Sequence, residues 1–306
     1  MGVVVAKHRP GTGAITDTAP GAAPRHRVWG RLIGTLGKRG WIVLVLFLLV
    51  LAAASILPGV FTPHDPELLN LQARLLSPGS SSTEGLHLLG TDTLGRDLFS
   101  RMIIGTRLTL FIAITATFIG AGIGVLFGLL GGYFGGRTDR LLMRLGEAQT
   151  AMPMFLVAIL LLSLLGPSVG ILIIVLPCLV WPIFARVVRA EALRLSEETF
   201  IEASVATGCS TPTILGRHLL PNVAPRILVL CVIEIGHVML SEAGLSFLGV
   251  GVQPPDTTWG LLISEGRPLL AVAWWLTILP GVLLGITVLV LNLLGRYWEA
   301  RSGAAG

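Results

Sequence analysis

The chain has 306 residues, of which 53% are hydrophobic and only 13% are charged. A soluble domain carries about 25% charged residues, so this composition cannot cover a globular surface that faces water. It excludes a soluble enzyme, a nucleic-acid-binding protein and a disordered chain, although the net charge is +5. The mean hydropathy of +0.82 indicates instead a protein that crosses a membrane several times.

A membrane-crossing helix needs about 20 residues, and six apolar stretches in the chain are close to this length. They lie at residues 41–57, 108–130, 145–165, 171–188, 227–248 and 274–294. The predicted fold class is therefore all-α, a polytopic membrane helix bundle with six transmembrane helices. Residues 41–57 would form the first helix, and residues 108–295 a five-helix core.

The distribution of Lys and Arg predicts the orientation, because cytoplasmic loops are enriched in these residues. With the N-terminus inside the cell, 17 of the 22 Lys and Arg residues lie on the cytoplasmic side. Both termini are then cytoplasmic, with a basic disordered tail at 1–40 and a short tail at 296–306. A cleaved signal peptide is the less favoured alternative, because residues 41–57 exceed the usual apolar region of a leader.

The segment between the first two spans, residues 58–107, is expected on the extracytoplasmic side. Within it, Asp92 can cap a short amphipathic helix that leads into the second span. Asp97 and Arg101 have the spacing of an i,i+4 ion pair on that helix.

The second span carries a glycine at every fourth position along one helix face. Small residues at this spacing let a second helix approach closely. We therefore expect a tight helix–helix contact here, although glycine is also common in membrane helices in general. The four glycines are Gly120, Gly124, Gly128 and Gly132.

The cytoplasmic loop between the fourth and fifth spans, residues 189–226, contains the signals of a short helix. Thr199 and Glu202 have the spacing of a capping box, and Gly208 fits a C-terminal helix stop. The helix predicted at 200–207 is too short to be stable alone in water. It must therefore pack against the membrane spans or against a partner protein.

The same loop carries apolar residues that a fully solvated connection would not need. These are Phe200, Ile201 and Val205, all within the predicted helix. A second helix is expected to begin at Thr211, with Pro212 in its first turn, and to end at Pro221.

Three ionisable residues, Glu234, His237 and Glu242, lie within the fifth span. Charged groups in a span are costly and usually face the bundle interior or an aqueous cavity. They are therefore candidates for lining a translocation pathway. The alternative is a buried structural pair, in which Glu234 and His237 share a hydrogen bond at i,i+3 spacing, or an interfacial position for Glu242.

Several features that could suggest enzyme or metal chemistry have simpler explanations. Ser168 lies in a G-x-S-x-G pattern, but a hydrolase nucleophile needs a strand before it, and here an apolar helix precedes a tight turn. No P-loop and no H-E-x-x-H motif occurs in the sequence. Cys178, Cys209 and Cys231 are far apart and suggest neither a disulfide framework nor a zinc site.

The order of residues in the cytoplasmic loop resembles the EAA loop of ABC importer permeases. The matching residues are Glu202, Ala203, Ser204, Gly208, His218 and Pro221. The blocks at 90–101, 131–139, 244–249 and 254–260 resemble the C-type permease subunit of the dipeptide, oligopeptide and nickel family. The resemblance covers about residues 35–295, with Ser204 in place of the usual alanine and an unusual sequence after Gly295.

This resemblance implies a non-catalytic permease with the type I ABC importer permease fold. It would form a heterodimer with a B-type permease subunit in the inner (plasma) membrane, surrounded by lipid and without nucleic acid. Two ABC ATPase subunits would bind ATP and Mg on the cytoplasmic side, so no cofactor or metal is expected in this chain. An extracytoplasmic binding protein would deliver the cargo.

Di- and oligopeptides are the expected cargo, with nickel or another small cargo as the alternative. A channel and a hydrolase that uses Ser168 are more distant alternatives. The resemblance assigns coupling to the ATPases to Phe200, Glu202, Ala203, Ser204, Gly208, His218 and Pro221. ATP would draw the ATPases together and rock the two membrane halves between inward- and outward-facing states.

Overall fold

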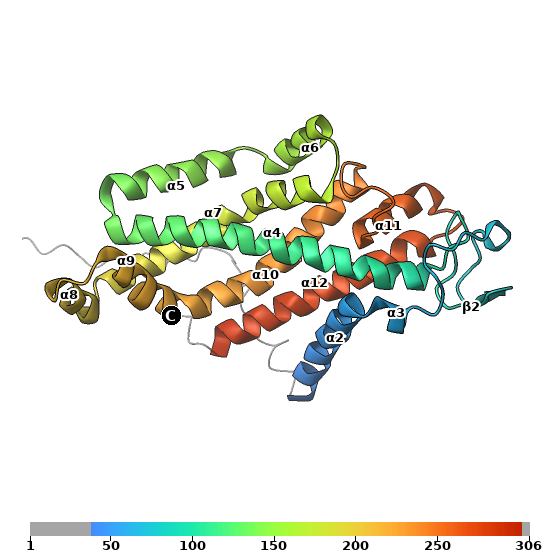
Figure 1. Cartoon of the computed structure of the whole chain (residues 1–306), viewed down its shortest axis with the longest axis horizontal. Helices are drawn as coiled ribbons and strands as arrows, with labels where there is room; N and C mark the ends of the chain where they lie inside the picture. Colours follow the sequence, from blue (N-terminus) through green and yellow to red (C-terminus); the bar gives the residue numbers. More distant parts are fainter. Residues whose placement is uncertain (1–37, 302–306) are drawn as a thin grey trace, which may run out of the picture.

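The computed structural model describes residues 38–301, and the predictions for the two tails fall largely outside this range. The long helices run lengthwise along the molecule, with α4 near its centre (Figure 1). The only strands in residues 38–301 form an antiparallel hairpin, β1 and β2, at one end. The short helix α8 lies at the other end. We call these the hairpin end and the α8 end.

The helices and strands follow one another with well-defined bounds. In chain order they are α2 Lys38–Ile56, α3 Pro58–Phe61, η1 Leu71–Ala73, β1 Ser80–Ser82, β2 Gly85–His87, α4 Leu98–Phe134, α5 Gly136–Ala151, α6 Met154–Leu165, α7 Val169–Ser196, α8 Thr199–Ala206, α9 Thr211–Thr213, η2 Ile214–Leu219, α10 Leu220–Phe247, α11 Trp259–Gly266, η3 Arg267–Leu269 and α12 Trp275–Arg301.

Four helical segments are long and apolar enough to cross a membrane. They are Leu98–Phe134, Val169–Ser196, Thr211–Phe247 and Trp275–Glu299. The bent pair α5 and α6 makes a fifth span if the two helices are counted together, and Gly40–Ile56 is a shorter apolar helix. Each of the six predicted stretches thus falls on a helical segment, and the all-α membrane bundle is confirmed.

The third predicted span, 145–165, is not one continuous helix. It is broken between α5 and α6, which are bent relative to each other by 78°. Pro153 lacks an N–H group and disfavours helical backbone at the preceding residue. Met152 accordingly adopts extended backbone, with φ −87° and ψ 139°. The prediction of a single span over 145–165 is therefore corrected to a helix pair broken at Pro153.

The fifth span begins earlier than predicted, because Pro221 does not end the preceding helix. The helical chain continues from Thr211 to Phe247. A π-helical turn, η2, lies directly before Pro221, and Leu220 donates its N–H to the carbonyl of Leu215. This wider turn gives room for the proline ring, which would clash with a carbonyl in a regular helix interior.

The extracytoplasmic segment also differs from its prediction, since Asp92 does not begin a separate amphipathic helix. Helix α4 begins at Leu98 and continues unbroken into the second span, and Asp97 caps it by accepting the N–H of Ser100 at 2.8 Å. Asp92 instead closes a turn, accepting the N–H groups of Leu94 and Arg96 at 2.8 and 2.9 Å.

The glycines of the second span face α7 along the centre of the bundle. A Cβ atom built on Gly124 would lie 2.5 Å from Cβ of Phe184 and from the carbonyl oxygen of Trp181. The same atom on Gly120, Gly128 or Gly132 would come within 2.5–2.7 Å of an α7 side chain. Only glycine permits this distance between α4 and α7, which we call the glycine seam.

At the hairpin end, the short helix α11 is fixed against α4 by Trp259. This side chain is fully buried, and its Nε1–H donates to the carbonyl of Met102 at 2.9 Å. Its backbone N–H donates to Oγ1 of Thr109 at 3.0 Å. These bonds connect segments that are about half the chain apart in sequence.

Candidate functional site

Helix α8 lies at the α8 end, in the loop that joins α7 to α10 (Figure 1). It begins at Thr199, one residue before the predicted start, so Glu198 is its N-cap and no side chain caps it. The predicted capping box of Thr199 and Glu202 is therefore wrong. The side chain of Glu198 points instead to Arg194 on α7, at 3.3 Å.

Helix α8 ends at Ala206, and Gly208, two residues later, has left-handed backbone with φ +79°. The N–H of Gly208 bonds to the carbonyl of Val205, and the N–H of Cys209 bonds to that of Ser204. This pair of hydrogen bonds is a Schellman motif, the helix stop that glycine favours. Oγ of Ser204 donates to the carbonyl of Phe200 at 2.7 Å, so the hydroxyl is satisfied within the helix.

Packing divides α8 into an anchored face and a presented face. Ile201 is only 2% exposed and contacts an apolar cluster that includes Leu195, Ile214 and Leu219. Phe200 and Val205, by contrast, are 40% and 54% exposed. The helix is therefore held to the ends of α7 and α10 while it offers apolar side chains to a partner.

The remaining residues predicted to couple to the ATPases are divided between two elements. Glu202 and Ala203 are exposed on α8. His218 lies in the π-helical turn and Pro221 in the first turn of α10, so neither belongs to the short helix itself. Asn222 donates to the carbonyl of His218 at 2.6 Å, which joins this turn to the next span.

A buried carboxylate that the sequence did not single out connects α8 to the membrane helices. Glu191 on α7 is buried and accepts from Arg194 and from Arg226 of α10, each at 2.6 Å. Arg194 also reaches Glu198 at the start of α8. These ion pairs link the start of α8 to both α7 and α10.

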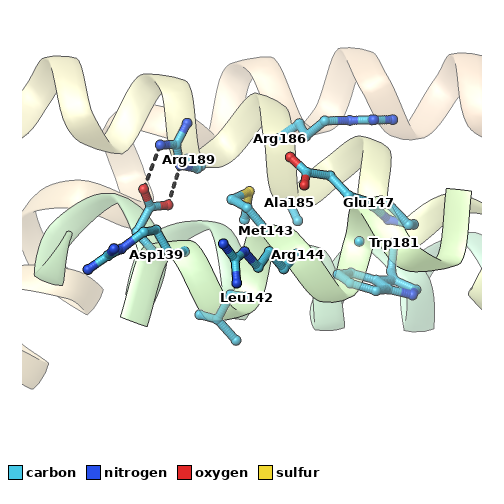
Figure 2. Close-up of a pocket in the computed structure, with 12 residues that line it drawn as sticks. Asp139, Leu142, Met143, Arg144, Glu147, Trp181, Ala185, Arg186 and Arg189 are labelled. Carbon is cyan, nitrogen blue, oxygen red and sulfur yellow. Dashed lines mark hydrogen bonds and ion pairs between the residues drawn. The ribbon is translucent and has the colours of Figure 1, made fainter. Parts of the chain in front are cut away.

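A cavity of about 360 Å³ lies between α5 and α7. Figure 2 shows Asp139 at one end of it, held by two hydrogen bonds from Arg189. Arg140, Arg144 and Arg186 also line it, so the cavity is strongly basic. Sequence reasoning missed this site because residues from α5 and α7 meet only in the fold.

A larger cavity, about 1050 Å³, lies at the hairpin end beside α2 and α4. Its charged lining includes Arg96, Arg101, Arg107, Glu67 and Asp256. Five apolar side chains of α4 also line it, together with residues of α2 and of the segments around Pro66 and Pro255. This mixed lining suits a small ligand that carries both charges and apolar groups.

The three ionisable residues of α10 do not form one site. Glu234 is buried and lies 3.3 Å from Nδ1 of His237, which is exposed. Glu242 is only 1% exposed, and its Oε1 accepts from Ser246 at 2.8 Å and from Thr258 at 3.0 Å. None of the three lines either cavity described above.

Glu242 has a structural position, because Thr258 is the N-cap of α11. Oγ1 of Thr258 accepts the N–H of Leu261 at 3.1 Å while its hydroxyl donates to Glu242. This arrangement fixes the start of α11 against α10, a structural role for Glu242 that the sequence did not indicate. Ser168 similarly serves as the N-cap of α7, accepting the N–H of Ile171 at 3.3 Å.

Comparison with known proteins agrees with this architecture. The sequence model of the family described as "Binding-protein-dependent transport system inner membrane component" matches residues 124–302. The chain is 38% identical over 250 residues to the glutathione transport system permease protein of Pectobacterium atrosepticum, covering 82% of each chain. It is also 38% identical over 212 residues to the oligopeptide transport system permease protein of Haemophilus influenzae, covering 69% of this chain and 68% of that one.

The solved structure of the MetNI methionine ABC transporter in an inward-facing conformation contains a chain with a similar fold. The TM-score is 0.51 at 21% sequence identity, covering 65% of this chain and 95% of the other. The protein defined by these observations is a multi-pass membrane permease. The chain belongs to the binding-protein-dependent inner membrane components, the permease subunits of ABC importers.

Proposed function

We propose that this chain is the C-type permease subunit of an importer for di- or oligopeptide-like cargo. It pairs with a B-type permease subunit, and two ATPase subunits bind at the α8 end. An extracytoplasmic binding protein delivers the cargo at the hairpin end. The observation that carries the proposal is the division of α8 into a buried face around Ile201 and an exposed face with Phe200 and Val205.

The orientation is argued from charge. The predicted topology puts 17 of the 22 Lys and Arg residues on one side of the membrane, the side of the α7–α10 loop, and the positive-inside rule makes that side cytoplasmic. Both termini are then cytoplasmic, in the inner membrane of the cell. ATP and Mg bind in the partner ATPases, and this chain supplies no catalytic group.

Transport then depends on α8 as the connecting element. When ATP draws the two ATPases together, α8 moves with them, and the Glu191 ion pairs carry the movement into α7 and α10. The two permease subunits rock about a central pathway, the general pattern of transporters with paired halves. Switching a 1:99 equilibrium to 99:1 takes about 5.5 kcal/mol of differential affinity, so ATP and loaded binding protein must both prefer the outward-facing state.

The named relatives transport glutathione and oligopeptides, which supports a peptide-like cargo for this chain. Such cargo carries carboxylates, amines and apolar groups. The cavity at the hairpin end offers arginines, acids and apolar walls to groups of these kinds. Nickel is the alternative cargo, and it would need nitrogen or sulfur ligands that this cavity lining does not offer.

The coupling proposal is tested by retention of the ATPase subunits on a tagged permease. We expect the double variant Phe200→Ala, Val205→Ala to lose them, because the exposed apolar surface of α8 is removed. The matched control is Leu86→Ala, an exposed apolar residue at the opposite end, which should retain them. Equal retention by both variants would contradict docking through α8.

The cargo is tested with the complete complex in liposomes, with its binding protein and ATP. Uptake of a labelled dipeptide should require ATP and fall when an unlabelled tetrapeptide or glutathione competes. Uptake of Ni²⁺ without uptake of any peptide would contradict the peptide assignment and favour the alternative cargo.

A further inference from the structure

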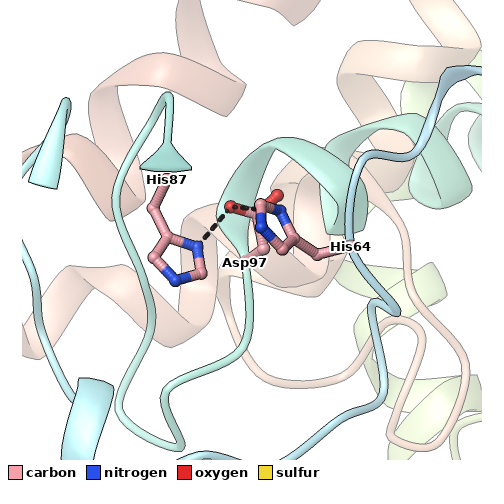
Figure 3. Close-up of side chains that lie close together, drawn as sticks. All are labelled: His64, His87 and Asp97. Atoms are coloured by element: carbon pink, nitrogen blue, oxygen red, sulfur yellow. Dashed lines mark hydrogen bonds and ion pairs between the residues drawn. The ribbon is translucent and has the colours of Figure 1, made fainter. Parts of the chain in front are cut away.

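Three residues that the transport proposal does not use meet at the hairpin end. Figure 3 shows His64 from the segment after α3, His87 from β2 and Asp97 at the N-cap of α4. Nδ1 of His87 lies 2.9 Å from Oδ1 of Asp97, and Nδ1 of His64 lies 3.8 Å from the same oxygen. One potential ligand atom from each residue lies within 4.8 Å of the other two.

The cluster is buried, and hydrogen bonding alone leaves it incomplete. His87 and Asp97 are each 1% exposed at the side chain, and His64 is 11% exposed. Nδ1 of His64 is buried and makes no hydrogen bond. The two imidazole rings stack with their centroids 4.7 Å apart, so both histidines face the same carboxylate from adjacent positions. An unpartnered buried nitrogen that faces a carboxylate needs an explanation.

We propose that His64, His87 and Asp97 form a binding site for one divalent transition-metal ion, best matched by Zn²⁺. Two imidazole nitrogens and a carboxylate oxygen suit Zn²⁺, Co²⁺ or Ni²⁺, whereas Mg²⁺ and Ca²⁺ prefer oxygen ligands alone. Zinc binds such nitrogen and oxygen atoms at about 2.0–2.2 Å. The three candidate ligand atoms lie within 4.8 Å of one another, so metal binding would draw the His64 ring closer to Asp97 and His87.

The surrounding hydrogen bonds hold two of the ligands in position. Nε2 of His87 lies 2.9 Å from Oγ of Ser82 across the hairpin. When Nδ1 binds the metal, the ring proton sits on Nε2 and is donated to this hydroxyl, an arrangement common for metal-bound histidines. The second oxygen of Asp97 remains the cap of α4, through the N–H of Ser100.

The metal would add a further connection between three segments of the hairpin end, where the N–H of His64 already donates to Oγ of Ser100 at 3.3 Å. His64 lies 33 positions before Asp97, and His87 lies on the hairpin between them. A bound ion therefore fixes the hairpin and the preceding segment onto the first turn of α4. The site goes beyond transport itself, because it sets the shape of the surface that faces the extracytoplasmic side.

The test is a Zn²⁺ titration of the full-length chain, purified in detergent and freed of metal with a chelator. We expect one Zn²⁺ ion per chain. Asp97→Asn and His64→Asn should each weaken binding by more than tenfold. Asparagine caps a helix as well as aspartate does, so Asp97→Asn preserves the start of α4. His218→Asn, at the α8 end, is the matched control and should bind as the unaltered chain does.

Two further readouts separate a metal site from a structural role of the same residues. Ser82→Ala removes the hydroxyl that hydrogen-bonds to Nε2 of His87 without removing a metal ligand, and it should weaken zinc binding about 10–100-fold. Co²⁺ should give visible absorption bands of a nitrogen–oxygen site that are lost in His64→Asn. Zinc binding of equal affinity in all variants, or no binding by the metal-free chain, would overturn the proposal.

Discussion

The two ends of the molecule are stabilised in different ways. At the α8 end, one buried isoleucine and a small apolar cluster hold a short helix whose other side chains are exposed. At the hairpin end, buried charges connect segments far apart in sequence, as where Arg101 bonds to Asp92 at 2.8 Å and Glu265 at 2.7 Å. The hairpin end is thus tied together by its own side chains, whereas α8 leaves an apolar face with Phe200 and Val205 exposed.

The largest effect is expected from Arg101→Ala at the hairpin end. Arg101 is 4% exposed and pairs with both Asp92 and Glu265. Removing one partner of a buried ion pair typically costs about 3–5 kcal/mol, and because Arg96 still pairs with Asp92 at 2.7 Å we expect the lower part of that range. We expect a large drop in the temperature of unfolding or failure to accumulate in the membrane. Arg74→Ala, an exposed arginine of the same segment, is the control and should change little. Similar behaviour of the two variants would show that the hairpin end does not depend on this network.

The glycine seam gives the next largest effect. Gly124→Leu should destabilise the bundle by about 1–3 kcal/mol, because the side chain must force α4 away from α7. Gly122→Leu is the matched control on the same helix, since a Cβ atom there would meet nothing within 4 Å. Thermal unfolding in detergent measures both. An equal loss in the two variants would mean that general helix propensity, not close packing, is responsible.

A smaller effect is expected at the end of α8. Gly208→Ala places a side chain at φ +79°, which costs roughly 1–2 kcal/mol. We expect fewer cargo molecules moved per ATP hydrolysed by the reconstituted complex, while the permease still inserts. Gly216→Ala adds the same atom in open space at ordinary φ and should preserve this ratio. If Gly208→Ala also preserves it, the position of α8 does not set coupling.

The smallest effect on folding is expected for Glu202→Ala. The structure has no capping bond from this residue, so the unfolding free energy should change by less than about 0.5 kcal/mol, as for most surface substitutions. A fall in ATPase retention without loss of stability would assign Glu202 to docking. A clear loss of stability would restore the capping box that the sequence suggested.

Local patterns predicted much of the fold, while contacts between distant segments escaped prediction. The spacing of four between glycines predicted a close helix contact, but not that α7 is the partner. The stop at Gly208 followed from glycine's tolerance of left-handed backbone. The pairing of Arg101 with Glu265 joins residues 164 positions apart, and no local pattern indicates it.

Two errors in helix bounds arose because a proline can either break a helix or be accommodated in it. Pro153 breaks a span and Pro221 does not, although both are prolines beside apolar helices. Their difference lies in the preceding turn, which is extended at Met152 and π-helical before Pro221. One candidate site residue was mispredicted for a similar reason. The sequence suggested that Glu242 lines a pathway, but it accepts a hydrogen bond from Thr258, the N-cap of α11.

The break between α5 and α6 has a consequence for what surrounds this chain in a bilayer. At a helix end, several peptide carbonyls or amides lack partners within the helix. Hydrocarbon cannot supply those partners, so irregular backbone at membrane depth is tolerated only against protein or water. Met152 and Leu156, beside the break, are more than half exposed in the isolated chain. This face must therefore contact water or another protein surface, because lipid alone cannot satisfy the backbone groups at the break.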